Sequence, residues 1–177
     1  MNETAEELRD LQSLLDISHA RSGEHLTGII NADRTLRATE LAGLLTGMRV
    51  LAVSSVTANG EPRISGVDGH FLSARWVFTT SGTAAKARQL KARPATSVAY
   101  IDGEDIAVYC HGRVEFLTPE HPDFAGVEDH LVAHYGSSPS SWGPSIVYCQ
   151  VRPTWMVGYA FKRSEILAKY GVAEEPR

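Results

Sequence analysis

Leucines that recur three and four residues apart mark the first element of the chain. They predict an amphipathic helix over residues 4–17, and Thr4 and Glu7 have the spacing of a capping box at its start. A second short helix is predicted over residues 38–46. We therefore expect residues 1–46 to form a helical extension that packs against the rest of the protein or against a partner subunit.

From residue 48 onward the pattern changes to short apolar runs that are separated by turn signals. Asn59-Gly60 is the strongest hairpin signal, and Asp68-Gly69 and Asp102-Gly103 mark two further turns. The apolar runs predict strands over residues 49–57, 61–67, 75–80, 96–101, 105–116 and 145–151.

Three helices and one loop complete the pattern. The helices are predicted over residues 84–92, 119–135 and 161–170. Residues 136–144 are rich in Ser, Gly and Pro, which predicts a surface loop. Because this loop also contains Trp142, it is a candidate lid over a binding site.

Strands in this number, joined by tight turns, favour an antiparallel barrel over a parallel doubly wound sheet. We predict a mainly β (α+β) fold, in which helices surround an antiparallel β-barrel. Neither an internal repeat nor a linker divides the sequence, so residues 1–177 are expected to form a single domain.

Charge and composition narrow the class of function. The net charge is −4 and the sequence pI is about 6.0, whereas a nucleic-acid-binding domain normally carries a basic excess. No apolar run approaches the length of a membrane span, and the first residues are acidic and polar rather than those of a signal peptide. We expect a cytoplasmic protein that binds neither nucleic acid nor membrane.

Cysteines and histidines give little support for a metal site. Cys110 and Cys149 each lie in an apolar segment without a nearby second cysteine, which favours buried, reduced thiols. His130 and His134 lie four residues apart on a predicted helix, with His121 nearby; packing or surface histidines are the preferred interpretation. The usual dinucleotide, phosphate-loop, zinc-protease and serine-hydrolase motifs are absent.

The segment that follows the third predicted strand carries the clearest chemistry. Hydroxyls gather there within five positions, and Gly82 is expected to let the backbone approach a ligand closely. The next helix offers free backbone N–H groups and the positive end of its dipole, which attract an anion. The hydroxyl residues are Thr79, Thr80, Ser81 and Thr83.

Lys86 strengthens the prediction of an anion site. A lysine in the first turn of a helix lies where positive charge is unfavourable, and a bound anion would remove this conflict. Arg63, on the preceding hairpin strand, is a second candidate cation. The alternative interpretation is that these charges are solvated on an exposed helix face and that Ser81 or Thr83 caps the helix. We refer to Arg63, the four hydroxyl residues and Lys86 together as the predicted phosphate site.

Residues 51–116 resemble the pyridoxamine 5′-phosphate oxidase-like superfamily of split-barrel flavin and deazaflavin oxidoreductases. No single motif in this range is specific, but the motifs in this order are characteristic of the superfamily. The resemblance rests on residues 53–60, 62–65, 76–81, 85–90, 94–100 and 112–115.

The resemblance implies a split β-barrel of the FMN-binding type. It also implies a homodimer with two cofactor sites at the subunit interface. Arg63, the strand end over residues 79–81 and Lys86 would face the cofactor phosphate. The last strand, ending at residues 152–155, would approach from the partner subunit, with Trp155 as a further cofactor contact; an ordinary core or interface aromatic is the alternative for Trp155.

Three departures argue against a true pyridoxamine 5′-phosphate oxidase. Asp68 stands where those enzymes have a lysine that meets the FMN phosphate, and it would repel a phosphate. Ala107 lies near the place of a glutamine. The Arg-x-His pattern that binds their substrate near the C-terminus is missing.

We therefore expect an oxidoreductase that uses FMN or a deazaflavin coenzyme and transfers hydride to or from a small molecule. His70, Tyr109 and His111 are candidate proton donors, but no catalytic residue is assigned. Two alternatives remain open. One is a module that binds flavin or haem without turnover, and the other is a structural dimer with an empty site.

Overall fold

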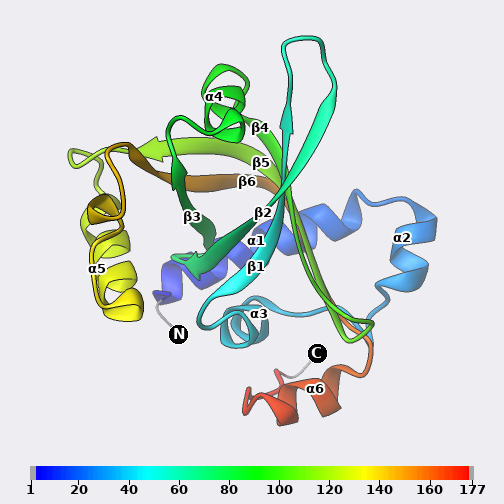
Figure 1. The fold of residues 1–177 in the computed structure, drawn as a ribbon. Coiled ribbons are helices and arrows are strands. Elements are labelled where there is room, and N and C mark those ends of the chain that lie inside the picture. The colour runs from blue at the N-terminus through cyan, green and yellow to red at the C-terminus, as the bar shows by residue number, and fades with distance from the viewer. Residues whose placement is uncertain (1–2, 176–177) are drawn as a thin grey trace.

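Six antiparallel strands close into a barrel in the computed structural model, which describes residues 3–175. The strand order is β1-β2-β3-β6-β5-β4, and β4 returns to β1 (Figure 1). The antiparallel barrel predicted from the sequence is thus confirmed. The strands are β1 (Arg49–Val56), β2 (Pro62–Leu72), β3 (Arg75–Ser81), β4 (Ala95–Asp102), β5 (Ile106–Leu117) and β6 (Ile146–Ala160).

Helices surround this barrel on several sides (Figure 1). The capping box forms as predicted, because Thr4 Oγ1 accepts a hydrogen bond from the Glu7 N–H at 3.2 Å. The first helix continues three residues beyond its predicted end, and α2 was not predicted. The helices are α1 (Ala5–Ala20), α2 (Glu24–Ile29), α3 (Ala38–Leu44), α4 (Ala85–Ala92), α5 (Phe124–Tyr135), the 3₁₀ turn η1 (Pro139–Ser141) and α6 (Arg163–Lys169).

The apolar core fills the barrel and extends to the helices outside it. Trp76 and Phe78 of β3 are completely buried in the main cluster, together with Leu11 and Leu15 of α1. On the opposite face of β3, Val77 packs in a second cluster that includes residues of α5. Strand β3 is therefore apolar on both faces over its first half.

The turn between β2 and β3 lies five residues later than the sequence predicted. Asp68 and Gly69 lie inside β2, and the turn is made by Ser73 and Ala74 with φ angles of 50° and 59°. Gly69 has a packing role instead, since a Cβ there would lie 2.2 Å from Leu51 Cδ1. The glycine signal marked a close approach between neighbouring strands rather than a turn.

Two other boundaries also differ. Strand β6 continues nine residues beyond its predicted end at residue 151, with a register shift on the partner strand between His111 and Gly112. The helix predicted over residues 119–135 begins only at Phe124. The Asn59-Gly60 turn is confirmed, with Gly60 at a φ of 83°.

The barrel is open between β2 and β3 at one end. These strands pair only where Gly69–Leu72 lies opposite Arg75–Phe78. Before Gly69, β2 pairs with β1 alone, and the resulting hairpin projects beyond the barrel (Figure 1). After Phe78, β3 pairs with β6 alone. The chain leaves β3 at Ser81 and enters α4 at Ala85, so the N-terminus of α4 lies at this open end.

The barrel closes between β1 and β4 through a narrow contact. Only two register pairs join these strands among the described residues, Ala52 with Ala99 and Val53 with Val98. Side chains reinforce the contact, because Thr96 Oγ1 donates to the Ser54 carbonyl at 2.7 Å.

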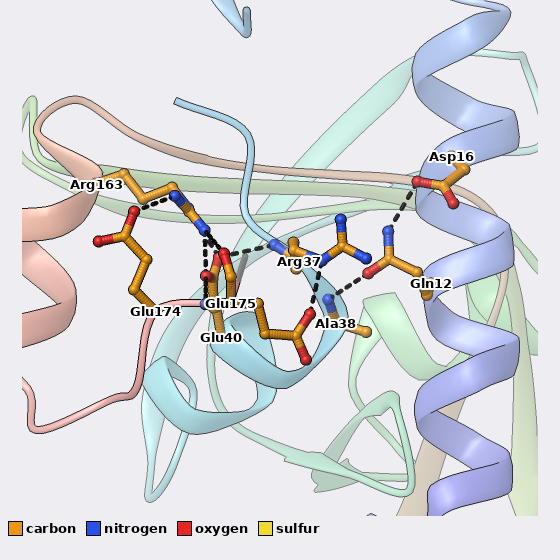
Figure 2. Close-up of polar contacts among 8 residues, drawn as sticks. All are labelled: Gln12, Asp16, Arg37, Ala38, Glu40, Arg163, Glu174 and Glu175. Carbon is orange, nitrogen blue, oxygen red and sulfur yellow. Dashed lines mark hydrogen bonds and ion pairs between the residues drawn. The ribbon is translucent and has the colours of Figure 1, made fainter. Parts of the chain in front are cut away.

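A polar network ties α3, α6 and the C-terminal segment together (Figure 2). Arg163, 3% exposed, donates to both carboxylate oxygens of Glu40, which is fully buried. The backbone N–H of Glu175 also donates to Glu40, at 2.9 Å, and the Glu175 carboxylate accepts from Arg37 Nε at 2.6 Å. Each buried charge of this network therefore has an ionic partner.

Candidate functional site

The hydroxyl residues at the end of β3 do not all point in one direction. Side chains alternate along a strand, so Thr80 shares the interior face of the barrel with Phe78. Thr79 and Ser81 lie on the opposite face, as Val77 does. Of these three predicted site residues, only Thr80 faces the open end of the barrel from inside.

A turn of two hydroxyl residues leads into α4. Ser81 Oγ lies 2.8 Å from Thr83 Oγ1 and accepts the Thr83 N–H at 3.2 Å. The N-cap of α4 is Ala84, and no side chain of residues 3–175 caps the helix there. The first turn also contains no acidic residue. The backbone N–H groups of this turn therefore keep their capacity to bind an anion.

Gly82 has a packing role beyond the one predicted. Its N–H donates to the Ser145 carbonyl at 2.6 Å, and a Cβ at this position would lie 2.9 Å from that same oxygen. The glycine is required because the backbone preceding β6 passes so close to it. Its predicted close approach to a ligand stays a prediction.

Lys86 lies half-buried in the first turn of α4. Burial raises the pKa of the Cys149 thiol to about 12, and the positive charge of Lys86 acts in the opposite direction. The lysine is thus close to the core at Cys149, which pairs with Phe78 of β3. Cys149 and Cys110 are both buried free thiols, as predicted.

Arg63 lies on the same side of the hairpin as α4. It is the register partner of Ser55, and directly opposed residues of an antiparallel pair project from the same face. Ser55 Oγ donates to Gln89 Oε1 of α4 at 2.7 Å, and Gln89 follows Lys86 by three residues, or about one turn. Arg63 is exposed and forms an ion pair with Glu61 at 2.7 Å. The fold therefore brings Arg63 and Lys86 to the same flank of α4.

Asp68 does not face this flank. Its position in the uninterrupted register of β2 places it on the opposite face from Arg63. It acts instead on Tyr135 of α5, whose pKa is raised by burial and, to a smaller extent, by the charge of Asp68. The predicted repulsion between Asp68 and a phosphate beside Arg63 is therefore wrong for this chain.

Trp155 lies far along β6 from the end of β3. It is nine residues beyond Ile146, the register partner of Ser81, which corresponds to about 30 Å along an extended strand. The indole stacks on His111 with 4.6 Å between ring centroids, and its Nε1 donates to the Ser18 carbonyl at 3.2 Å. Its expected role as a contact from the partner subunit stays a prediction.

Three histidines meet between β2 and α5. His70, only 1% exposed, contacts Tyr135 Oη through Nε2 at 3.1 Å and His130 Nε2 through Nδ1 at 3.0 Å. The His134 ring lies 4.8 Å from His70, centroid to centroid. Burial, and then His130 and His134, lower the pKa of His70 to about 4. These contacts hold His70 in its neutral form.

The sequence pattern had found His130 and His134 but not their buried partner. A one-turn spacing is visible in sequence, whereas the pairing of β2 with α5 depends on the tertiary fold. His121 lies apart from them, where its Nδ1 accepts the Asp123 N–H at 3.1 Å. Among residues 3–175 no group of three or more His, Cys, Asp or Glu side chains is arranged to hold a metal ion.

The loop over residues 136–144 is the candidate lid. It contains η1, and its Trp142 packs edge-on against Tyr135 with 4.9 Å between ring centroids. Its role as a lid stays a prediction.

No helix within residues 3–175 is both long and apolar enough to cross a membrane.

Comparison with known proteins assigns the family. Residues 38–157 match the family model described as pyridoxamine 5′-phosphate oxidase. The chain therefore belongs to this family, and its six-stranded barrel with peripheral helices is a split barrel of this family. No curated protein matches the chain.

Solved structures agree on the fold. An F420 reductase is 23% identical, with a TM-score of 0.51 over 64% of this chain and 92% of that one. The haem storage protein HutZ from Vibrio cholerae is 15% identical, with a TM-score of 0.59 over 70% of this chain and 96% of that one. The protein Atu2129 from Agrobacterium tumefaciens is 16% identical, with a TM-score of 0.56 over 66% of this chain. The chain spans about half, 53%, of the length of that last protein.

Proposed function

We propose that this protein binds a phosphorylated flavin-type cofactor, FMN or a deazaflavin coenzyme, and acts as an oxidoreductase on a small molecule. The observation that carries this proposal is the N-terminus of α4. It has no capping side chain among the described residues, no acidic residue in its first turn, and a half-buried lysine where a cation is unfavourable. An anion bound there would satisfy the N–H groups and the lysine together.

The residues of the open barrel end fit the phosphate of such a cofactor. Lys86 and the first-turn N–H groups of α4 would bind the phosphate, with Thr80 as a hydrogen-bond donor from the interior face of β3. Arg63 would add a second cation once it leaves its exposed ion pair with Glu61. Such charge-assisted contacts favour a phosphate over a neutral group.

Hydride transfer is the chemistry that the cofactor supplies when it is bound. The chain's own part is to hold the phosphate, orient the attached ring system and limit access of water. Neither acid nor base catalysis is assigned to a residue. The buried His70 is bound by Tyr135 and His130, which leaves it a structural group.

The protein is further proposed to be a homodimer with its cofactor sites at the subunit interface. Trp155 is separated by about 30 Å of strand from the end of β3, which favours a contribution across an interface. The hairpin of β1 and β2, which projects beyond the barrel in Figure 1 and carries the exposed Arg63, would lie beside the partner. Light scattering after size exclusion tests this, and a monomer at micromolar concentration would contradict it.

Titration of purified protein with FMN, and separately with a deazaflavin coenzyme, tests the cofactor. Quenching of the cofactor's fluorescence gives Kd, and Lys86→Gln is expected to raise it by about 10- to 100-fold. The matched control is Lys169→Gln on α6, which should bind as the wild type does. The proposal fails if neither cofactor binds, or if Lys86→Gln and Arg63→Gln both leave Kd unchanged.

Turnover separates an enzyme from a binding module. A loaded protein that is reduced by a nicotinamide donor, or oxidised by a quinone, supports an oxidoreductase. Tight cofactor binding without any turnover would favour the non-catalytic alternative. A Soret band after addition of haem, in a protein that binds no flavin, would show that the cofactor is haem rather than a flavin.

A further inference from the structure

A pocket lies on the other side of α4 from Lys86. Its volume is about 630 Å³, within the range of small-molecule sites. It is lined by α4, the end of β5, the start of α5, η1 and the start of β6. Its apolar wall is made chiefly by Phe116, Phe124, Ile146 and Tyr148.

Two cations of α4 line this pocket, Arg88 and Lys91. They are three residues apart, which places them on one face of the helix. At about 100° per residue, Arg88 lies about 200° around α4 from Lys86. The buried stripe of Ala87 and Leu90 separates the two cationic flanks on one side. The pocket is thus distinct from the predicted phosphate site.

The charges around the pocket are of one sign. Its lining contains the two cations and no carboxylate. Glu128 is not part of this lining, and it accepts a hydrogen bond from the hydroxyl of Tyr148. Arg88 is held in place by a hydrogen bond from Nη1 to the Thr83 carbonyl. In a chain of net charge −4, this is a local basic surface over an aromatic cavity.

We propose that this pocket binds an organic anion with an apolar, aromatic body. Phe116, Phe124 and Tyr148 would contact the ring system, and Arg88 and Lys91 would bind the acidic group. This ligand class does not depend on a cofactor at the phosphate site. Gly82 lines this pocket and also lies just before the N-terminus of α4. A ligand in the pocket would therefore lie next to a cofactor whose phosphate is bound at α4.

Two fluorescent probes test the ligand class. Anilinonaphthalene sulfonate carries an aromatic body and an anionic group, and phenylnaphthylamine has the same rings without the charge. The wild type is expected to bind the sulfonate saturably, with one site per chain. The double variant Arg88→Gln/Lys91→Gln should weaken the sulfonate about tenfold and leave phenylnaphthylamine within about twofold.

A filling variant gives a second, independent measurement. Thr118 lines the pocket and is exposed, so Thr118→Trp should occupy the cavity without disturbing the core, and both probes should then lose affinity. The matched charge control is Arg9→Gln/Lys169→Gln, which removes one arginine and one lysine from exposed positions elsewhere. This control should bind both probes as the wild type does.

The outcomes separate this proposal from the proposed function. Lys86→Gln should weaken FMN but not the sulfonate probe. If FMN does not bind the wild type while the probes behave as expected, the pocket stands and the cofactor proposal fails. If the double variant and Thr118→Trp both bind the sulfonate as the wild type does, the proposed anion pocket is wrong.

Discussion

Ser55 on β1 donates its hydroxyl to Oε1 of Gln89 on α4, over 2.7 Å. Ser55 is also the register partner of Arg63, so this hydrogen bond joins the hairpin that carries Arg63 to the helix that carries Lys86. Ser55 is almost fully buried, which makes the bond a fixed part of the fold. The two candidate cations are therefore positioned by one contact between elements that are distant in sequence.

Ser55→Ala tests this contact. It is expected to lower the free energy of unfolding by about 1–2 kcal/mol, because the Gln89 amide loses a buried partner. It should also weaken FMN binding by a few-fold, since the hairpin is no longer held against α4. Urea unfolding and FMN titration measure the two effects. In a double-mutant cycle with Gln89→Ala, strictly additive stability changes would contradict the proposed coupling.

Glu61→Gln should strengthen binding of a phosphorylated cofactor. Arg63 and Glu61 form an exposed ion pair at 2.7 Å, and such pairs contribute about 0.2–1 kcal/mol. Removing the carboxylate frees the guanidinium, so Kd for FMN should fall by about 1.5- to 5-fold at low salt. The gain should vanish in Glu61→Gln/Arg63→Gln. An equal gain in both variants would show that Arg63 is not involved.

Stability should fall as the pH drops from about 6.5 to about 4. The fold lowers the pKa of His70 from 6.5 to about 4, so neutral His70 contributes fully above 6.5, and that contribution is lost as the pH falls toward 4. Its size is on the order of 2–3 kcal/mol. The 3.0 Å contact between His70 Nδ1 and His130 Nε2 gives the geometric reason, because it cannot hold a proton on both nitrogens.

The measurement is urea unfolding between pH 7.5 and 4.5, for the wild type and His70→Gln. Asp68, His130, His134 and Tyr135 also surround this position and remain in the variant, so the difference between the two proteins isolates His70. The variant should be less stable at pH 7.5 and lose less stability on acidification. Parallel curves for the two proteins would contradict the assignment to His70.

Glu40→Gln should be among the most damaging single substitutions in this chain. It leaves buried Arg163 without its principal anion, which costs about 3–5 kcal/mol. Glu174→Gln removes a more exposed carboxylate from the same arginine and should cost less than about 1 kcal/mol. Urea unfolding compares the two variants, and equal losses would mean that burial of Glu40 is not the cause.

Local signals predicted the parts of the fold that depend on neighbouring residues. The Asn59-Gly60 turn, the capping box of Thr4 and the helix after β3 all follow from chemistry within a few positions. The barrel followed from the number of strands and the tight turns between them. The start of α4 beside Lys86 also follows from nearby residues, whereas the binding of a phosphate there stays a prediction.

Features that depend on long-range packing were not visible in the sequence. Gly69 and Gly82 were interpreted as turn and ligand glycines, but each accommodates a segment that is distant in sequence. The turn at Ser73 and Ala74 contains no glycine, so the sequence gives no signal for it. The direction of Asp68 could not be known until the register of β2 with β1 was established.

The narrow contact between β1 and β4 determines how this barrel would come apart. Two register pairs join those strands, whereas β5 and β6 pair over twelve. Amide hydrogen exchange should therefore be faster at Val98 and Ala99 than in the middle of the ladder between β5 and β6, and each opening event would turn the closed ring into a sheet with two free edges. Such edges accept a strand from another molecule, so opening at this contact would expose the protein to edge-to-edge association.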